Sequence, residues 1–198
     1  MEFREAVARR RMVRHFSNQA VDREVLDRIA EAAQRAPSAG FSQGQRLMVV
    51  TGPAGRARIA EICGEEEMVE AGFDRWISQC AAIFIPCVSE KVYHDRYREA
   101  DKIQEDGREI DWPVPYWWMD VGCTVMLILL ASVDEGLAAG FAGTDAAGYA
   151  AFKSEFGVPD DFSLVGFIPV GHPLPDKRSP SLARGWLSRG EFVRWERW

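Results

Sequence analysis

The segment from Asp120 to Leu137 constrains the fold more than any other part of the chain. Within it, the run Val121–Val133 contains no charged residue and is bracketed by Asp120 and Asp134. This run is well short of the ~20 apolar residues that a bilayer-spanning helix needs. The segment therefore predicts a central helix that is wholly buried in a globular fold.

Shorter segments on both sides of this helix alternate between helical and strand patterns. Further helices are predicted at residues 2–11, 23–35, 56–62 and 146–156, and strands at 47–51, 81–88, 138–143 and 163–170. Asp22 is the expected N-cap of the second helix. Pro86 indicates an edge strand or a bulge, because proline lacks a backbone N–H. This alternation predicts an α/β or α+β domain with one small sheet, spanning residues 1–198.

Composition and charge exclude several functional classes. The net charge of −6 argues against a general nucleic-acid binder, which needs a concentrated positive surface. The four cysteines and three histidines show no metal-ligand spacing, so we expect free buried thiols and no metal site. The N-terminal sequence lacks the apolar region of a signal peptide. We therefore expect a cytoplasmic protein without a membrane partner.

Positive charge gathers near the N-terminus in Arg10, Arg11 and Arg14. A helical surface would place Arg10 and Arg14 on one face, four residues apart, with Arg11 beside them. An anion between them would relieve their repulsion, and guanidinium groups bind phosphate through paired hydrogen bonds. The more common alternative for such a charge pattern is a solvated basic face, compensated here by Glu2 and Glu5.

The sequence "RAPSAGFSQGQ" at residues 35–45 joins a predicted helix to a predicted strand. Its proline ends the helix, and Gly40 and Gly44 would let the backbone approach a flat ligand closely. Gln43 offers an amide that donates and accepts, as the imide edge of a flavin requires. The alternative is an ordinary connecting loop, since no residue here is diagnostic alone.

Two other segments have similar open alternatives. Residues 136–145 are mostly small, which would expose backbone N–H groups at the end of a strand or allow close helix–sheet packing. In the tail, Lys177, Arg178 and Arg184 could meet the N-terminal arginines or form a loose cationic tail.

Taken in order, these motifs resemble the nitroreductase family of FMN-dependent flavoproteins. The sequence "RRMVRHF" at residues 10–16 is similar to the family pattern R-R-S-x-R-x-F, and "APSAGFSQGQRLMVV" partly matches A-P-S-x-x-N-x-Q-P-W before an apolar strand. The segments "EGLAAGFAG" and "RWERW" also agree with the family. The chain departs from the pattern at Met12, Phe41, Gly44 and Gln45, where the family has serine, asparagine, proline and tryptophan.

The resemblance implies an α+β sandwich, with a mixed or antiparallel central sheet enclosed by helices. Two copies would form an intertwined homodimer that holds FMN at the subunit interface, with the tail at 171–198 wrapping the partner. The arginines would bind the phosphate, ribityl or pyrimidine parts of FMN, and backbone N–H groups would lie near N5. The implied cofactor contacts are Arg10, Arg11, Met12, Arg14, Pro37, Ser38, Ala39, Phe41, Gln43, Gly143, Thr144, Arg178 and Arg184.

The polar, irregular segment at residues 89–118 would then form a lid over the flavin, and we call it the lid segment. Its aromatic side chains could stack on an aromatic substrate. The implied substrate contacts are Phe41, Tyr93, Tyr97, Trp112 and Tyr116. The alternative is packing at the dimer interface, which the position of Trp117 and Trp118 beside the apolar helix favours.

The resemblance implies an FMN-dependent oxidoreductase. Hydride would pass from NADH or NADPH through flavin N5 to a small organic acceptor such as a nitro compound or a quinone, without an essential acid–base side chain. The first alternative is an oxygen-dependent, flavin-fragmenting enzyme of the dimethylbenzimidazole synthase type. The sequence "SAGFSQ" is similar to that branch of the family. The second is a flavin- or deazaflavin-binding protein without turnover.

Overall fold

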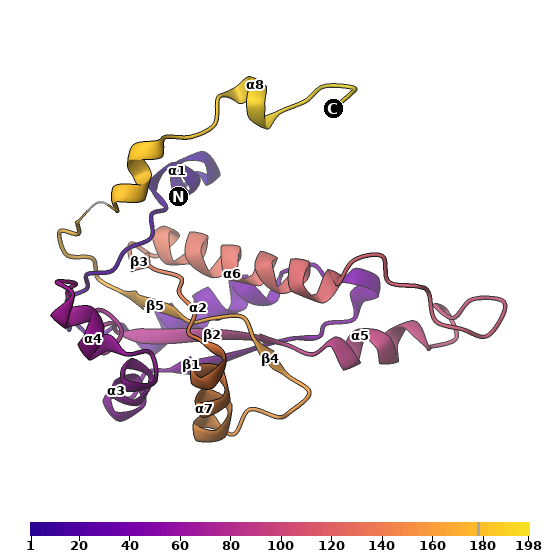
Figure 1. Cartoon of the computed structure of the whole chain (residues 1–198), viewed down its shortest axis with the longest axis horizontal. Helices are drawn as coiled ribbons and strands as arrows, with labels where there is room; N and C mark the ends of the chain where they lie inside the picture. The colour runs from indigo at the N-terminus through magenta and orange to yellow at the C-terminus, as the bar shows by residue number, and fades with distance from the viewer. Residues whose placement is uncertain (178) are drawn as a thin grey trace.

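The fold is built on a five-stranded antiparallel sheet (Figure 1). The computed structural model describes residues 1–177 and 179–198. The strands lie side by side in the order β1 (Gln45–Val50), β2 (Ala82–Val88), β5 (Ile168–Gly171) and β3 (Ala138–Ala139). The short β4 (Ser163–Leu164) pairs with the C-terminal end of β2. Every strand pair is antiparallel, which confirms the predicted type of sheet.

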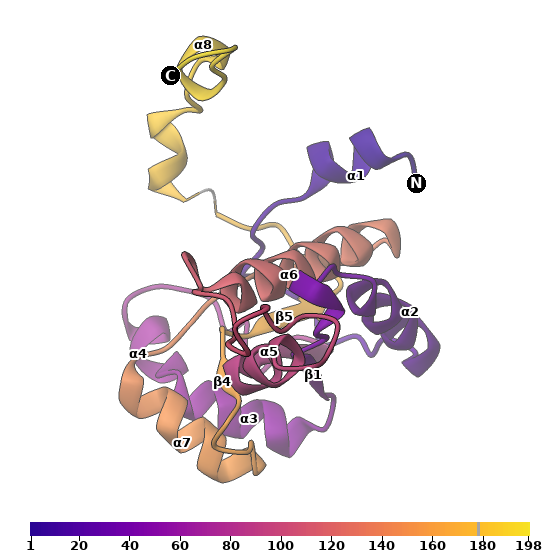
Figure 2. The same cartoon turned by 90° about the vertical axis from the view of Figure 1, so that its right-hand side faces the viewer.

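Helices cover both faces of this sheet. The helical elements of the described residues are α1 (Phe3–Arg9), α2 (Arg23–Gln34), the short η1 (Ala39–Phe41), α3 (Pro53–Ile62), α4 (Glu65–Glu70), α5 (Glu90–Tyr97), α6 (Tyr116–Asp134), α7 (Ala146–Phe156), and, in the tail, η2 (Pro180–Arg184) and α8 (Arg189–Phe192). Figures 1 and 2 show α2 and α6 on one face and α3 and α7 on the other. The predicted α+β sandwich is confirmed.

Strand β2 explains how one short sheet supports two cores. All of its residues are buried, and successive side chains of a strand point to opposite faces. Ala82 and Phe84 pack with α2 and α6, whereas Ile83, Ile85 and Cys87 pack with α3 and α7. The continuous apolar sequence of β2 therefore matches a strand that is covered on both faces.

Pro86 lies within the central strand, so the prediction of an edge strand was wrong. On one side of β2, β5 pairs with residues 82–84 and β4 pairs with residues 87–88. The carbonyl of Pro86 accepts a hydrogen bond from the Val165 N–H at 3.2 Å on this side. The missing N–H of the proline therefore falls at the break between the two partner strands, where no ladder bond is lost.

Helix α6 is buried on one face only, which corrects the prediction of a wholly buried helix. Val121, Ile128 and their neighbours pack on the sheet, but the exposed fractions of Trp118, Met119 and Met126 are 43%, 59% and 46%. By length and composition α6 would also pass as a bilayer-spanning helix, a test that core helices pass too. An apolar outer face of this kind is typical of an interaction surface.

Candidate functional site

Residues 10–14, which we call the arginine segment, are extended and lie along the edge of the sheet. Helix α1 ends at Arg9, and Arg10 has φ −58° and ψ 122°. Met12 forms a parallel bridge with Ala139, and the Val13 N–H donates to the Ala139 carbonyl at 3.1 Å. The prediction of one helical arginine face was therefore wrong, because the chain leaves the helix before Arg10 and continues beside β3.

Arg10, in the arginine segment, is half-buried and has one buried guanidinium nitrogen without a partner in the described part of the chain. This nitrogen is Nη1. Burying an unpaired charge is costly. A phosphate group would remove this cost through charge-assisted hydrogen bonds, so the side chains present fit an anionic ligand.

Gly140 lets the arginine segment lie against the sheet. A Cβ atom at this position would be 2.5 Å from the Val13 carbonyl oxygen, closer than packed atoms can approach. Gly143 and Thr144 follow a few residues beyond Ala139. Even a fully extended chain would separate Ala139 from Gly143 by at most about 14 Å. Gly143 is exposed and Thr144 is half-buried. The arginines and these two residues therefore lie along one edge, within reach of one elongated ligand.

The loop at residues 37–43 is held in a strained conformation. Gly40, Phe41 and Gln43 have φ values of 60°, 55° and 53°, which are unfavourable for side chains other than glycine. Ser38 Oγ accepts from the Gln43 N–H at 2.9 Å, and the Ala39 N–H donates to Asp120 Oδ2 at 2.8 Å. Phe41 is 74% exposed, so the loop presents this ring to the outside of the molecule.

The loop and the arginine segment lie near opposite ends of α6 (Figure 1). The loop is bonded to Asp120 near the start of the helix, whereas β3, beside the arginine segment, follows its end. A helix of 19 residues is about 28 Å long. One chain therefore does not bring the two groups of predicted cofactor contacts together.

The lid segment contains α5 and packs its aromatic residues on one another. Tyr97 and Trp112 have ring centroids 4.5 Å apart, and both side chains are half-buried, as is Tyr116. Tyr93 is fully buried and its hydroxyl donates to Asp120 Oδ2 at 2.9 Å. Burial, together with Asp120, raises the pKa of Tyr93. The prediction of Tyr93 as a substrate contact is corrected, because its ring supports the loop from inside.

Replacing Tyr93 with phenylalanine is expected to lower the free energy of unfolding by about 1.5 kcal/mol, because Asp120 loses a donor in a partly buried site. Urea unfolding followed by circular dichroism measures the change. Tyr149→Phe is the matched control, since its hydroxyl lies 3.4 Å from the Val165 carbonyl oxygen, and we expect a loss below about 0.5 kcal/mol there. Equal losses in the two variants would contradict this role of Tyr93.

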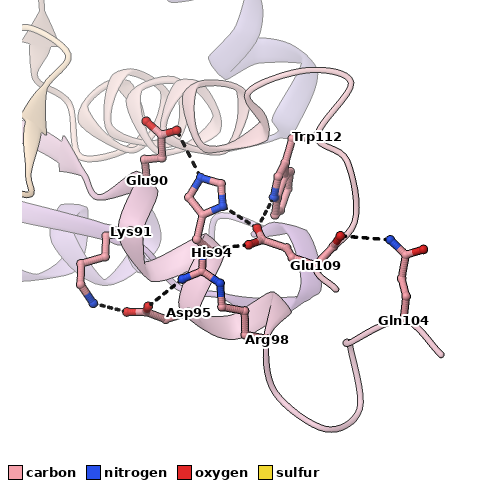
Figure 3. Close-up of polar contacts among 8 residues, drawn as sticks. All are labelled: Glu90, Lys91, His94, Asp95, Arg98, Gln104, Glu109 and Trp112. Atoms are coloured by element: carbon pink, nitrogen blue, oxygen red, sulfur yellow. Dashed lines mark hydrogen bonds and ion pairs between the residues drawn. The ribbon is translucent and has the colours of Figure 1, made fainter. Parts of the chain in front are cut away.

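A polar cluster ties the loop after α5 to the helix. Figure 3 shows His94 between Glu90 and Glu109, with Nε2 3.2 Å from Glu90 Oε1. Glu109 also accepts from the Trp112 indole and pairs with Arg98 at 3.1 Å. Burial acts to lower the pKa of His94, but its contacts with Glu109 and Glu90 outweigh burial and raise it. No sequence pattern indicates this cluster, because its members follow no motif.

The cluster predicts that the lid segment loosens as the pH rises. Because the pKa of His94 is higher in the folded than in the unfolded protein, its contribution to stability is complete below the unfolded-state pKa, near pH 6.5. The contribution is lost as the pH rises through the folded-state pKa. Hydrogen exchange of residues 98–115 is therefore expected to accelerate, beyond its intrinsic pH dependence, between about pH 6 and pH 9. His94→Gln should abolish this extra acceleration. Its persistence in that variant would assign it to another group.

The C-terminal tail projects from the body of the fold (Figure 2). Trp186, Trp195 and Trp198 are 91%, 74% and 104% exposed. Arg184, in η2, is exposed as well, and the predicted contact at Arg178 lies outside the described residues. The tail therefore buries almost no apolar surface within its own chain.

The sheet between two helical layers defines an α+β protein, and a cationic segment lies along the edge of this sheet. The family model of the Nitroreductase family matches residues 7–172. The chain therefore belongs to the nitroreductase family, which confirms the resemblance found in its motifs.

The relatives include iodotyrosine deiodinases. The enzyme of Nematostella vectensis is 23% identical over 193 residues, with 92% of this chain and 71% of the relative covered. Iodotyrosine deiodinase 1 of Sus scrofa is 26% identical over 194 residues, with 92% and 65% covered. The chain thus spans about two thirds of the length of the deiodinases that it matches.

Solved structures share the fold at low sequence identity. The NADPH:FMN oxidoreductase from Vibrio harveyi has a TM-score of 0.74 and 17% identity, covering 99% of this chain and 77% of that chain. An FMN-dependent nitroreductase from Clostridium difficile has a TM-score of 0.72 and 14% identity, with 98% of both chains covered. These similarities support the nitroreductase-like fold.

Proposed function

We propose that this member of the nitroreductase family is an FMN-dependent oxidoreductase that uses NADH or NADPH to reduce a small aromatic acceptor. The main support is the buried Nη1 of Arg10, which has no partner within the described ranges. Arg10 belongs to the segment along the sheet edge, where we place the anionic, elongated cofactor. The FMN-dependent and NADPH:FMN enzymes that share the fold agree with this choice of cofactor.

The residues of this chain would divide the work of holding the cofactor. Arg10, Arg11 and Arg14 bind the phosphate, and the backbone N–H groups of Gly143 and Thr144 orient the ring. Bound FMN would supply hydride acceptance and donation. The chain's own side chains then need only bind, orient and exclude water.

The proposal includes a cytoplasmic homodimer. The loop at 37–43 is bonded to Asp120, and β3, which lies beside the arginine segment, follows Asp134, so about 21 Å of α6 separates them. A second copy would therefore supply the loop for each site. The exposed apolar face of α6 and the projecting tail offer surface for this pairing. Both features fit an obligate interface, which is more apolar than ordinary protein surface.

Replacing Met119 with glutamate tests the homodimer. Its side chain is exposed in the single chain, so folding should persist. At an interface, however, the buried charge would weaken dimer affinity by about 100-fold or more. Sedimentation velocity and FMN titration measure the two effects, with Phe73→Glu as the control because Phe73 is exposed to nearly the same extent and belongs to the loop after α4. A dimeric Met119→Glu variant would contradict this interface.

The lid segment supports an aromatic acceptor. Tyr97, Trp112 and Tyr116 remain partly accessible, and Phe41 would face the partner's site. A nitro compound or a quinone fits such a surface. A halogenated phenol is a second candidate acceptor, favoured by the iodotyrosine deiodinases among the relatives.

The test is the visible spectrum of the purified protein with and without added FMN, followed by anaerobic NADH or NADPH and then air. The proposal expects a bound flavin spectrum that bleaches with reductant and returns intact in air. Loss of the flavin in air would favour the flavin-fragmenting alternative. A flavin that does not bleach would favour a binding protein, and no bound flavin would overturn the proposal.

A further inference from the structure

Glu65 is a buried carboxylate that has no established role. It is 2% exposed and pairs with no cation among residues 1–177 and 179–198. Its Oε1 accepts from the backbone N–H groups of Trp76, Ile77 and Ser78 at 2.9, 2.6 and 3.2 Å, and its Oε2 accepts from the Ser78 hydroxyl. One carboxylate thus fixes the backbone of three consecutive residues.

Trp76, the first of these residues, lies directly beneath the arginine segment. It is 2% exposed, and its indole has the Arg14 guanidinium above it, with Cζ 5.6 Å from the ring centroid. Its edge is 3.2 Å from where a Cβ of Gly140 would be. The ring also packs in the core with Phe167, with centroids 6.4 Å apart. Trp76 therefore connects the core to the cationic edge.

Arg14 is fixed at its backbone and at one face of its guanidinium. Its N–H donates to Asp176 Oδ2 at 2.8 Å, and the guanidinium Cζ lies over the Trp76 ring. The side chain makes no ion pair with a carboxylate in the described part of the chain. An arginine held over an aromatic ring can still donate hydrogen bonds to an anion, and it has already lost part of its rotamer freedom. This arrangement prepares Arg14 for a phosphate.

We propose that Trp76 is a positioning residue for the phosphate of FMN, acting through Arg14, and that Glu65 holds Trp76 in place. The inference rests on the proposed FMN function and extends it to two residues that make no direct contact with the cofactor. It predicts a defect confined to the phosphate. Riboflavin, which lacks the phosphate, should bind the variants almost as it binds the wild type.

The experiment compares the dissociation constants of FMN and riboflavin by quenching of flavin fluorescence. Trp76→Leu is expected to weaken FMN about 2- to 5-fold relative to riboflavin, the range of a cation–π contact. Trp76→Phe keeps an aromatic face and should retain the wild-type ratio of the two constants. Phe152→Leu removes a buried ring from the same core, 2% exposed, and should leave the ratio unchanged.

Glu65→Gln provides a second test if Trp76→Leu does not fold. It keeps the size of the side chain but weakens the hydrogen bonds to residues 76–78, so FMN binding should fall relative to riboflavin in the same direction. An unchanged ratio in the folded variants would overturn the positioning role while leaving the FMN function intact. A wild-type protein that binds neither flavin would instead overturn the proposed function.

Discussion

Replacing Arg10 with methionine is expected to lower the affinity for FMN by about 10- to 100-fold, the range for losing hydrogen bonds to a charged group. The same change should leave the cofactor-free protein as stable as the wild type, or more stable. FMN affinity falls while stability does not, because the buried Nη1 has no partner in the described part of the chain. This unpaired nitrogen costs folding free energy until an anion binds.

Two measurements separate these effects. Titration with FMN gives the affinity, and thermal unfolding without cofactor gives the stability. Arg9→Met is the matched control, because Arg9 is adjacent but exposed, and is already paired with Glu5 at 3.1 Å. Wild-type FMN affinity in the Arg10 variant, or equal losses in both variants, would refute the phosphate site.

Replacing Gly140 with alanine is expected to destabilise the protein by about 1–3 kcal/mol, the cost of overpacking a tight contact. The new methyl group would lie 2.5 Å from the backbone oxygen of Val13, which cannot rotate away. The arginine segment must then move off β3. FMN affinity should fall with it, even though Gly140 carries no side chain that could bind the cofactor.

Urea unfolding and FMN titration of the same preparation test this coupling. Gly190→Ala is the control, because a Cβ there has no neighbour within 4 Å and its φ is not in the left-handed region. We expect its stability to stay within about 0.5 kcal/mol of the wild type. A Gly140→Ala variant with unchanged stability and affinity would show that the close approach is unimportant.

Local sequence patterns predicted the helices and strands that are buried by contacts within this chain. Helix α7 begins and ends where predicted, at Ala146 and Phe156, and β2 differs by one residue at its start. Helix α6 was identified, but its exposed side was not, because apolar composition alone does not show which side of a helix is covered. Pro86 led to the wrong prediction of an edge strand. Its missing N–H is tolerated in the central strand only because it lies where two partner strands meet, and the sequence does not show this position.

Residues of the candidate site could be predicted only where they belong to a recognisable sequence motif. The arginine segment was found from its sequence, but its extended backbone depends on the bridge to Ala139, a contact distant in the chain. Glu65 lies in the run "GEEE" and looks like a solvated acid. Its burial depends on the return of residues 76–78 to the same place, and no spacing reveals that return.

The separation of the loop and the arginine segment by α6 has a consequence for mixtures of chains. In a proposed dimer, each site takes its arginines from one copy and its loop from the other. Consider a hybrid of one chain altered at Arg10 and another altered at Phe41. Both defects meet in one site and the other site is left intact, so mixing two impaired parents would restore one unaltered site in each hybrid dimer.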